Sequence, residues 1–205
     1  MESNIKINYD KKLEELISSL DYKPKLLLHS CCGPCSSYVI TYLKDYFDIT
    51  ILYYNPNIEP FCEYEKRKKE QIRLINELNC DIKLLDCDYE NDIYRKCVKG
   101  YENDKEGGHR CHLCYRLRLN KTSEIAKEKG FEYFGTTLTV SPYKNAQVLN
   151  QIGGELAKQY DIKYLYSDFK KKDGYKKSIE LSKKYNLYRQ DYCGCLFSKE
   201  QNLEE

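Results

Sequence analysis

The spacing of apolar residues along the chain changes repeatedly between a helical period and the short continuous runs of buried strands. Apolar side chains between residues 13 and 20 recur every three or four positions, whereas the run KLLLH at 25–29 is apolar almost throughout. The same change of pattern continues along the chain. It predicts strands at 25–29, 48–54, 82–85, 131–138 and 162–166, and helices at 9–20, 38–46, 60–78, 89–99, 109–129, 144–160 and 173–185.

Strands that alternate with helices of about ten residues or more are typical of an α/β protein whose parallel sheet is flanked by helices. No internal repeat or low-complexity linker divides the chain, so we expect a single domain over residues 1–205. Ligands of such folds bind beyond the carboxyl ends of the strands. We therefore expect the chemistry at the loop after the first strand, SCCGPCSS at 30–37.

Composition adds one unusual feature, which is the number of cysteines: 11 in 205 residues. Hydrophobic residues at 41% and charged residues at 32% are near the globular average, which excludes wholesale disorder. The chain starts without the apolar stretch of a signal peptide, and no window approaches the roughly 20 apolar residues of a membrane span. We expect a soluble cytoplasmic protein with no membrane partner, in which clustered cysteines serve metal or redox chemistry.

Charge is nearly balanced overall, at +2, but it is uneven along the chain. Residues 163–189 carry nine Lys or Arg against three Asp or Glu, and residues 190–205 carry one Lys against four acids. An isolated run of lysines is most often a solvated helix face. The run becomes a candidate for nucleic-acid binding only if other evidence points to that partner.

Two cysteine groups lie where the pattern predicts a loop followed by a helix. Cys31, Cys32 and Cys35 follow the first strand, and the helix dipole beside them favours thiolates. Cys111 and Cys114 are three residues apart on the first turn of a predicted helix, so both sulfurs project from one face. Two such groups in one chain are a strong indication of a metal site.

The identity of the metal is open on the residues alone. Cys31, Cys32, Cys111 and Cys114 would complete the closed set of four ligands that a structural zinc ion requires. Adjacent cysteines chelate one small ion poorly, however, and Cys35 is left beside the site. An iron-sulfur cluster can take sulfur from both loops, so we favour it over zinc.

The other cysteines and the histidines allow more than one interpretation. Cys193 and Cys195, in a Cys-Gly-Cys turn, suit either a redox pair or proton donor near a metal, or a small packed turn. His29 either orients a thiolate or is a core histidine. We expect the isolated cysteines to be buried small hydrophobic residues: Cys62, Cys80, Cys87 and Cys97.

Six ordered motifs together resemble the cobalamin-independent epoxyqueuosine reductases, the QueH family, over residues 26–198. They are HSCCGPCS, YYNPNIEP with EYEKR, CHLCYRLRL, TTLTVSPYKN, YSDFKKKDGY, and YNLYRQDYCGC. The resemblance implies a fold of the nucleotide alpha-hydrolase type, HUP or PP-loop-like. It also implies an oxidoreductase that reduces the epoxide of epoxyqueuosine in tRNA to queuosine, the last step of queuosine biosynthesis. Glu59 occupies a position where many members have histidine, so it receives no role.

The resemblance also implies cofactors, which are a [4Fe-4S] cluster and an adjacent iron ion. By position, the cluster ligands are Cys31, Cys32, Cys111 and Cys114, and Cys35 joins them as a metal ligand where some relatives have Asp. Candidate proton donors are Cys193, Cys195, Tyr143 and Asp168. The implied partners are tRNA with epoxyqueuosine at the wobble position and an unidentified electron donor. The basic residues expected to frame the cleft for RNA phosphates are Arg110, Arg116, Arg118, Lys121, Lys170, Lys171, Lys172, Lys176 and Lys177.

Two other functions fit parts of this pattern. A PP-loop-like tRNA sulfurtransferase needs a phosphate loop of small residues after the first strand, but here Pro34 removes an N–H donor and thiols crowd the turn. A zinc-stabilised RNA-binding module would use the same cysteines without catalysis. Broad visible absorbance, stoichiometric zinc and ATP-dependent thiolation would distinguish the three.

Overall fold

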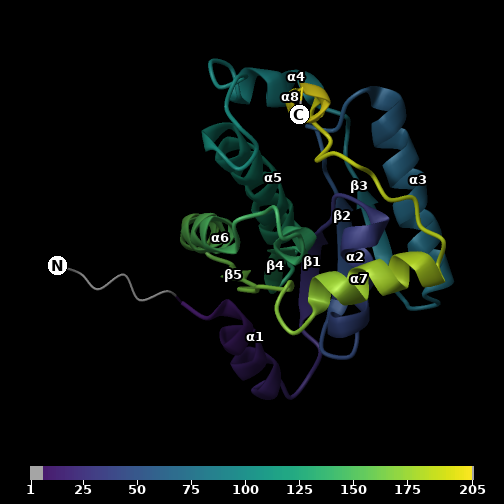
Figure 1. The fold of residues 1–205 in the computed structure, drawn as a ribbon. Coiled ribbons are helices and arrows are strands. Elements are labelled where there is room, and N and C mark those ends of the chain that lie inside the picture. Colours follow the sequence, from purple (N-terminus) through teal and green to yellow (C-terminus); the bar gives the residue numbers. More distant parts are fainter. Residues whose placement is uncertain (1–6, 205) are drawn as a thin grey trace.

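A five-stranded parallel sheet runs through the centre of the protein, in the strand order β3-β2-β1-β4-β5 (Figure 1). The computed structural model describes residues 7–204. Among these residues, no helix is long and apolar enough to cross a membrane. The strands are β1 (Lys25–His29), β2 (Asp48–Tyr53), β3 (Lys83–Asp86), β4 (Tyr133–Thr136) and β5 (Lys163–Tyr164).

Helices cover both faces of the sheet because β1 is buried on both sides. Leu26 and Leu28 pack in one core with α2, whereas Leu27 packs in a second core with α5 and α6. In Figure 1, α3 and α7 lie on the same side as α2, and α6 lies beside α5. The helices are α1 (Tyr9–Ser18), α2 (Gly33–Leu43), α3 (Phe61–Glu77), α4 (Asn91–Cys97), α5 (His109–Glu128), α6 (Ala146–Tyr160), α7 (Gly174–Lys184) and α8 (Leu196–Glu204).

The topological switch point of the sheet lies between β1 and β4, because successive strands are added on opposite sides of β1. From β1 the chain adds β2 and β3 on one side, then crosses back through α4 and α5 to add β4 on the other. Beyond this reversal, the carboxyl ends of two adjacent strands diverge and leave a crevice for ligands. His29 and Thr136, the last residues of β1 and β4, are register partners at this edge.

The structure confirms the predicted α/β class with its parallel sheet flanked by helices. Three of its elements differ from the prediction. The helix α2 starts at Gly33 inside the predicted loop, because Pro34 suits a first helical turn, where no N–H is needed. The fourth strand ends at Thr136, since Thr137–Val140 forms a 3-10 helix that the Thr136 hydroxyl caps. The C-terminal α8 had no predicted counterpart.

Candidate functional site

Three thiols meet at the carboxyl end of β1, where the chain turns into α2. The Sγ atoms of Cys31, Cys32 and Cys35 all lie within 4.8 Å of one another, and within residues 7–204 no other three His, Cys, Asp or Glu ligand atoms do so. The Cys31 and Cys32 sulfurs are 3.7 Å apart. Extended backbone at Cys32, the N-cap of α2, is followed at once by helix, which places Cys35 on the first turn beside the other two.

The three thiols form a site that favours a bound cation. Hydrogen bonds from the Cys31 and Cys35 thiols lower the pKa of Cys32 well below its ordinary value. The hydrogen bond to Cys32 raises the pKa of Cys31 to about 12, and those to Cys31 and Cys32 raise that of Cys35 well above its ordinary range. One thiolate is therefore favoured without a metal. A thiophilic cation would compensate the charge of the other two, so this donor set fits a metal.

Buried polar contacts fix the loop that carries these thiols. The hydroxyls of Ser30 and Ser36 both donate to the Gln71 side-chain oxygen of α3, each at 2.8 Å. Asn55 Nδ2 donates to the Ser30 carbonyl, also at 2.8 Å. The loop is thus tied to α3 and to the end of β2.

His29 is a core histidine rather than a partner of the thiols. Its Nε2 lies 3.1 Å from the Tyr54 carbonyl oxygen and its Nδ1 lies 3.0 Å from the Thr136 hydroxyl. Burial lowers the pKa of His29 to about 3, so the ring is neutral. It joins the ends of β1, β2 and β4 and leaves no ring nitrogen for a sulfur.

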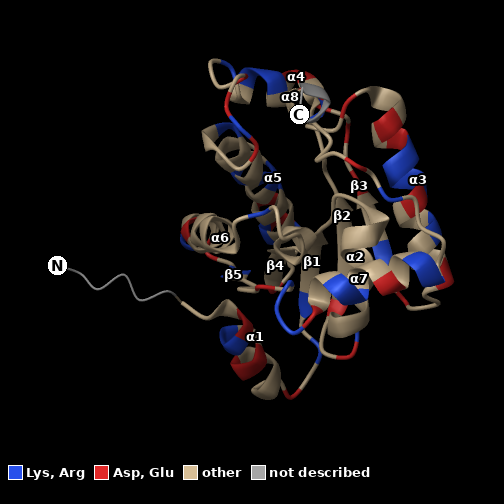
Figure 2. Cartoon of the chain, in the orientation of Figure 1, with Lys and Arg blue, Asp and Glu red and all other residues tan. Residues whose placement is uncertain are grey.

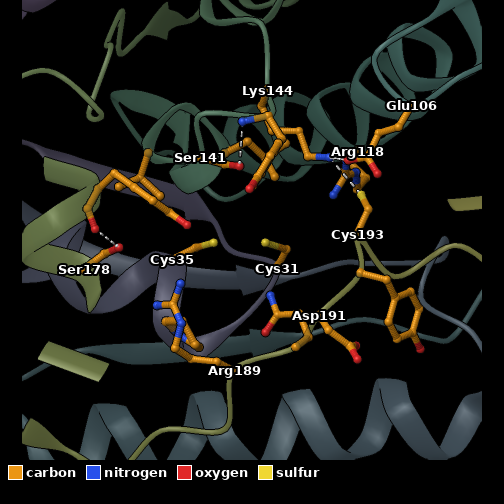
Figure 3. A pocket seen from close by; sticks show the side chains of 17 residues that line it. Cys31, Cys35, Glu106, Arg118, Ser141, Lys144, Ser178, Arg189, Asp191 and Cys193 are labelled. Atoms are coloured by element: carbon orange, nitrogen blue, oxygen red, sulfur yellow. Dashed lines mark hydrogen bonds and ion pairs between the residues drawn. The ribbon is translucent and has the colours of Figure 1, made fainter. Parts of the chain in front are cut away.

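The three thiols lie beside a cavity of about 350 Å³, which Cys31 and Cys35 line (Figure 3). The sulfurs of Cys31 and Cys35 point into this space from below Lys144 in the view, and Cys193 lies beside Lys144. The cavity is within the size range of small-ligand sites in proteins. Its lining also includes Glu106, Arg118, Tyr143, Arg189, Gln190 and Asp191.

Lys144 carries a buried positive charge at the cavity wall. Its ammonium group donates to Glu106 Oε1 at 2.8 Å and to Cys193 Sγ at 3.0 Å. Burial alone would lower the pKa of Lys144, but the nearby Cys193, Tyr115 and Glu106 outweigh this and raise it well above its ordinary value. The side chain therefore stays protonated and faces a thiol and the cavity.

A second buried cation, Arg118 of α5, connects the two cysteine groups. Burial would lower the pKa of Arg118, but negative charge at Cys114, Cys193 and Cys31 raises it. Its Nη2 has no hydrogen-bond partner among the described residues. An anionic group in the cavity would satisfy it.

The CxxC pair lies in the first turns of α5, as predicted. Gly107 N–H donates to the Cys111 sulfur at 3.2 Å, while Cys114 packs with Cys195 and Tyr94. Burial raises the pKa of Cys111, and it raises that of Cys114 to about 12. Cys193 at the cavity raises the pKa of both thiols further.

A segment from the C-terminal end of the chain, residues 185–195, forms one wall of the cavity. We call it the C-terminal strap. Arg67 of α3 is buried and donates to the carbonyls of Tyr192 and Cys193 at 3.4 and 3.2 Å. The Gly194 carbonyl accepts from Glu59 N–H at 2.8 Å, and at φ +126° only glycine is unstrained there.

The side chain of Gln190 reaches from the strap to the thiol group. Its Nε2 donates to the Cys32 sulfur at 3.0 Å. Hydrogen bonds of this kind support metal-bound thiolates. Glu59 has a structural role instead, since Arg95 donates to its Oε1 at 2.6 Å.

The structure separates the four candidate proton donors. Cys193 and Tyr143 line the cavity. Cys195 is buried behind it, and Asp168 lines a neighbouring hollow, where it pairs with Lys170 at 2.8 Å. The expectation that the isolated cysteines are buried was wrong, because Cys62 is exposed and the other three, Cys80, Cys87 and Cys97, are half-buried.

The basic residues expected to frame the cleft have different environments. Arg118 lines the cavity, and Lys170 and Lys171 line the neighbouring hollow. Arg110 is buried and donates to the Glu102 carbonyl, and Arg116 pairs with Glu155. Lys121 of α5 pairs with Glu124, and Lys172 pairs with Asp10 and Glu14. Lys176 and Lys177 belong to α7, where Figure 2 shows positive charge.

Sequence reasoning missed Lys144, Glu106, Arg189 and Gln190, all of which line the cavity. Lys144 lies within TTLTVSPYKN, and the Arg-Gln pair lies within YNLYRQDYCGC. Both motifs had been noted, so the signal was present. The sequence did not show that these segments lie around one cavity in the folded protein.

Sequence comparison finds relatives that match most of the chain. A family model described as epoxyqueuosine reductase QueH matches residues 26–201. A relative named Epoxyqueuosine reductase QueH from Staphylococcus epidermidis is 45% identical over 204 residues, covering 95% of this chain and 86% of the relative. The proteins of the same name from Staphylococcus aureus and Streptococcus pyogenes are 45% and 41% identical, each covering 97% of this chain and 86% and 80% of the relative.

A solved structure extends the comparison to the fold. The U34-tRNA thiolase NcsA from Methanococcus maripaludis with its [4Fe-4S] cluster superposes with a TM-score of 0.51 at 13% identity, covering 96% of this chain and 71% of that chain. This likeness confirms the expected fold class of the HUP or PP-loop type.

Proposed function

The chain belongs to the QueH family of epoxyqueuosine reductases, and from that premise we propose how its cavity performs the reaction. The protein is an oxidoreductase that reduces epoxyqueuosine to queuosine in tRNA. Opening the epoxide to an alkene breaks both C–O bonds and forms one C=C bond. It consumes two electrons and two protons and releases the oxygen as water.

The proposed metal ligands are the thiols of both cysteine groups. Cys31, Cys32, Cys111 and Cys114 would hold a [4Fe-4S] cluster, and Cys35 would contribute to binding an adjacent iron ion. When bound, these groups supply single electrons at low potential and Lewis acidity. The fit rests on three thiols within 4.8 Å of one another and on the unsatisfied Nη2 of Arg118 among the described residues. The electrons come from a donor protein or small reductant.

The side chains of the cavity supply the protons and the charge. Lys144 stays protonated beside Cys193, so the two groups form a pair that can deliver a proton to the departing oxygen. Glu106 holds the Lys144 ammonium from the other side. Arg118 stabilises negative charge that develops in the cavity.

The modified base must leave the RNA stack to reach this cavity. We infer that the substrate is the anticodon loop of tRNA with epoxyqueuosine at the wobble position, because a single-stranded loop can present an unstacked base. The cavity of about 350 Å³ has room for the cyclopentane ring system and part of the base.

The observation that carries this mechanism is the cluster of three thiols, Cys31, Cys32 and Cys35, at the cavity that Lys144 also lines. Anaerobic purification tests it. Iron and acid-labile sulfide are measured with the visible spectrum, and turnover of epoxyqueuosine tRNA is followed by mass spectrometry as loss of one oxygen atom. We expect bound iron, broad visible absorbance and reductant-dependent turnover. A colourless zinc protein without turnover would contradict the proposal, as would ATP-dependent thiolation of the tRNA.

Variants of Lys144 test the proton pair separately from the metal. Lys144→Gln removes the proton and is expected to lower kcat by about 10²-fold or more, with iron content unchanged. Lys144→Arg keeps the charge and should retain more of the rate. Equal rates in wild type and Lys144→Gln would remove Lys144 from the mechanism.

A further inference from the structure

The most exposed large aromatic side chain recorded in the structure stands at the rim of the cavity. Tyr143 is 73% exposed, compared with 58% for Tyr22. It lines both the thiol cavity and a second hollow next to it. Because this ring projects into solvent where the two hollows meet, its face is open to contact with a ligand.

The second hollow provides positive charge beside that ring. Lys170 and Lys171 line it, together with Asn8 and Gln147. Lys171 is exposed, and Lys170 is held by an ion pair with Asp168 at 2.8 Å. Backbone hydrogen bonds from Lys170 to Thr139 and from Lys171 to Asp168 fix the two lysines to the scaffold rather than leaving them on a free loop. The backbone that carries the two lysines is therefore held in place beside the ring.

Single-stranded RNA has the chemistry that fits such a pair of features. When one base is extruded into a cavity, its neighbour loses a stacking partner and lies at the rim. Proteins stabilise bases in that position by stacking on aromatic rings, while lysines bind the backbone phosphates. An aromatic ridge between a base-sized cavity and a basic hollow matches this arrangement.

Resting on the proposed function, we propose that Tyr143 stacks on the base next to epoxyqueuosine and that Lys170 and Lys171 bind the adjoining phosphate. Tyr143 is thus a substrate-positioning residue whose ring matters and whose hydroxyl does not. This differs from a role as proton donor, which requires the hydroxyl to reach the departing oxygen inside the cavity. The exposure of Tyr143 favours stacking.

Binding of an anticodon stem-loop RNA carrying epoxyqueuosine tests the proposal on the anaerobic holoenzyme. The Kd is measured by fluorescence anisotropy for wild type, Tyr143→Phe, Tyr143→Ala and Lys171→Ala, with Tyr22→Ala as the matched control. Tyr22 is also exposed but precedes β1, so it lies at the opposite edge of the sheet.

We expect Tyr143→Ala to raise the Kd about 5- to 100-fold, from the cost of losing one stacked base. Tyr143→Phe and Tyr22→Ala should stay within about twofold. Lys171→Ala should reduce the slope of log Kd against log salt by about 0.7, which corresponds to one phosphate contact on a single strand.

Three outcomes would overturn the proposal. Unchanged binding by Tyr143→Ala would remove the stacking contact. A loss of kcat in Tyr143→Phe with an unchanged Kd would assign the hydroxyl as a proton donor instead. Failure of wild type to bind or reduce the RNA would overturn the proposed function itself, and this is distinguishable because it needs no variant.

Discussion

The two walls of the cavity are built in different ways. One wall comes from the short segment where β1 ends and α2 begins, of which Cys31, Pro34 and Cys35 line the cavity. The other is assembled from side chains far apart in sequence, including Glu106, Arg118 and Lys144, and from the C-terminal strap. The first wall holds the thiols that we assign to the metal, whereas the second holds Lys144 and Cys193, which we assign to proton delivery.

This difference separates cofactor chemistry from substrate chemistry. The thiol wall is fixed by a strand, a helix N-terminus and a buried amide, Gln71, so its geometry follows from local structure. The charged wall depends on long-range contacts, such as that between Arg67 and the strap. Changes in the first wall should therefore alter metal content, and changes in the second should alter stability and rate while metal content stays.

Removing a thiol from the first wall gives the largest expected effect. Cys32→Ala deletes the one sulfur of the three whose pKa is lowered, so the site loses its preferred thiolate. We expect loss of most of the bound iron and at least about a 100-fold decrease in turnover, since even changing a residue that only contacts a metal ligand costs about 10- to 100-fold.

The matched control for this thiol is Cys62→Ala, because Cys62 is exposed on α3. That variant should keep wild-type iron content and turnover. If Cys32→Ala retained full iron and activity, the thiol wall would not be the metal-binding wall.

The strap gives the next largest effect, and it should appear in stability. Arg67 is 1% exposed and pairs with Glu63 at 2.6 Å while it donates to two strap carbonyls. Arg67→Ala leaves a mostly buried carboxylate without its partner, which costs about 3 kcal/mol or more. Urea unfolding should show this loss in the free energy of unfolding.

Lys96→Ala is the control for removal of a charge from a helix, because Lys96 is 81% exposed in its pair with Asp92. Its effect should stay below about 1 kcal/mol. Equal midpoints for Arg67→Ala and wild type would show that the strap holds its place without Arg67.

The contrast between the walls also explains how far the sequence predicted the site. The sheet, most helices and the Cys31–Cys35 group followed from patterns within short windows, because apolar periodicity and a Gly-Pro turn act locally. The boundary of α2 was missed by a few residues, since the Cys-rich segment hides the fact that Pro34 starts a helix.

The charged wall was not predictable in the same way. The SPYKN motif suggests a surface lysine at Lys144, but the fold buries this side chain and brings Glu106 and Cys193, which is 49 residues later, to its ammonium group. Asp168, a candidate proton donor from its motif, lines the neighbouring hollow and pairs with Lys170. Such residues depend on tertiary contacts that no local pattern encodes.

A smaller test addresses the end of the strap, where α8 meets the charged wall. Ser198 is buried, and its hydroxyl donates to Glu106, the carboxylate that holds Lys144. Ser198→Ala should lower the free energy of unfolding by about 1.5 kcal/mol, the usual worth of a hydrogen bond to a charged group.

Iron content and turnover of the same variant test whether the two walls are independent. Iron content should stay at the wild-type level while kcat falls a few-fold, because Lys144 loses part of its support. Loss of iron in Ser198→Ala would show that the two walls are not independent. Ser18→Ala is a matched control, since that hydroxyl bonds only within α1.

The smallest expected effect is a pH dependence of stability at the contact between Glu70 of α3 and the strap. The Arg73 guanidinium lowers the pKa of Glu70, and the Tyr188 N–H, which Glu70 Oε1 accepts at 2.6 Å, lowers it further. A depressed carboxyl pKa means that the unfolded state binds the proton at higher pH. The contribution of Glu70 is therefore complete above about pH 4.5, its ordinary value, and is lost as pH falls through the lower folded pKa.

Comparison of wild type with Glu70→Gln measures this contribution. The difference in free energy of unfolding should be about 1 kcal/mol or less near neutral pH and should shrink below about pH 4.5. Glu65→Gln, on the same helix without a recorded ion pair, should show no such convergence. A constant difference between wild type and Glu70→Gln down to acid pH would mean that Glu70 holds the strap through its hydrogen bond and that its charge plays no part.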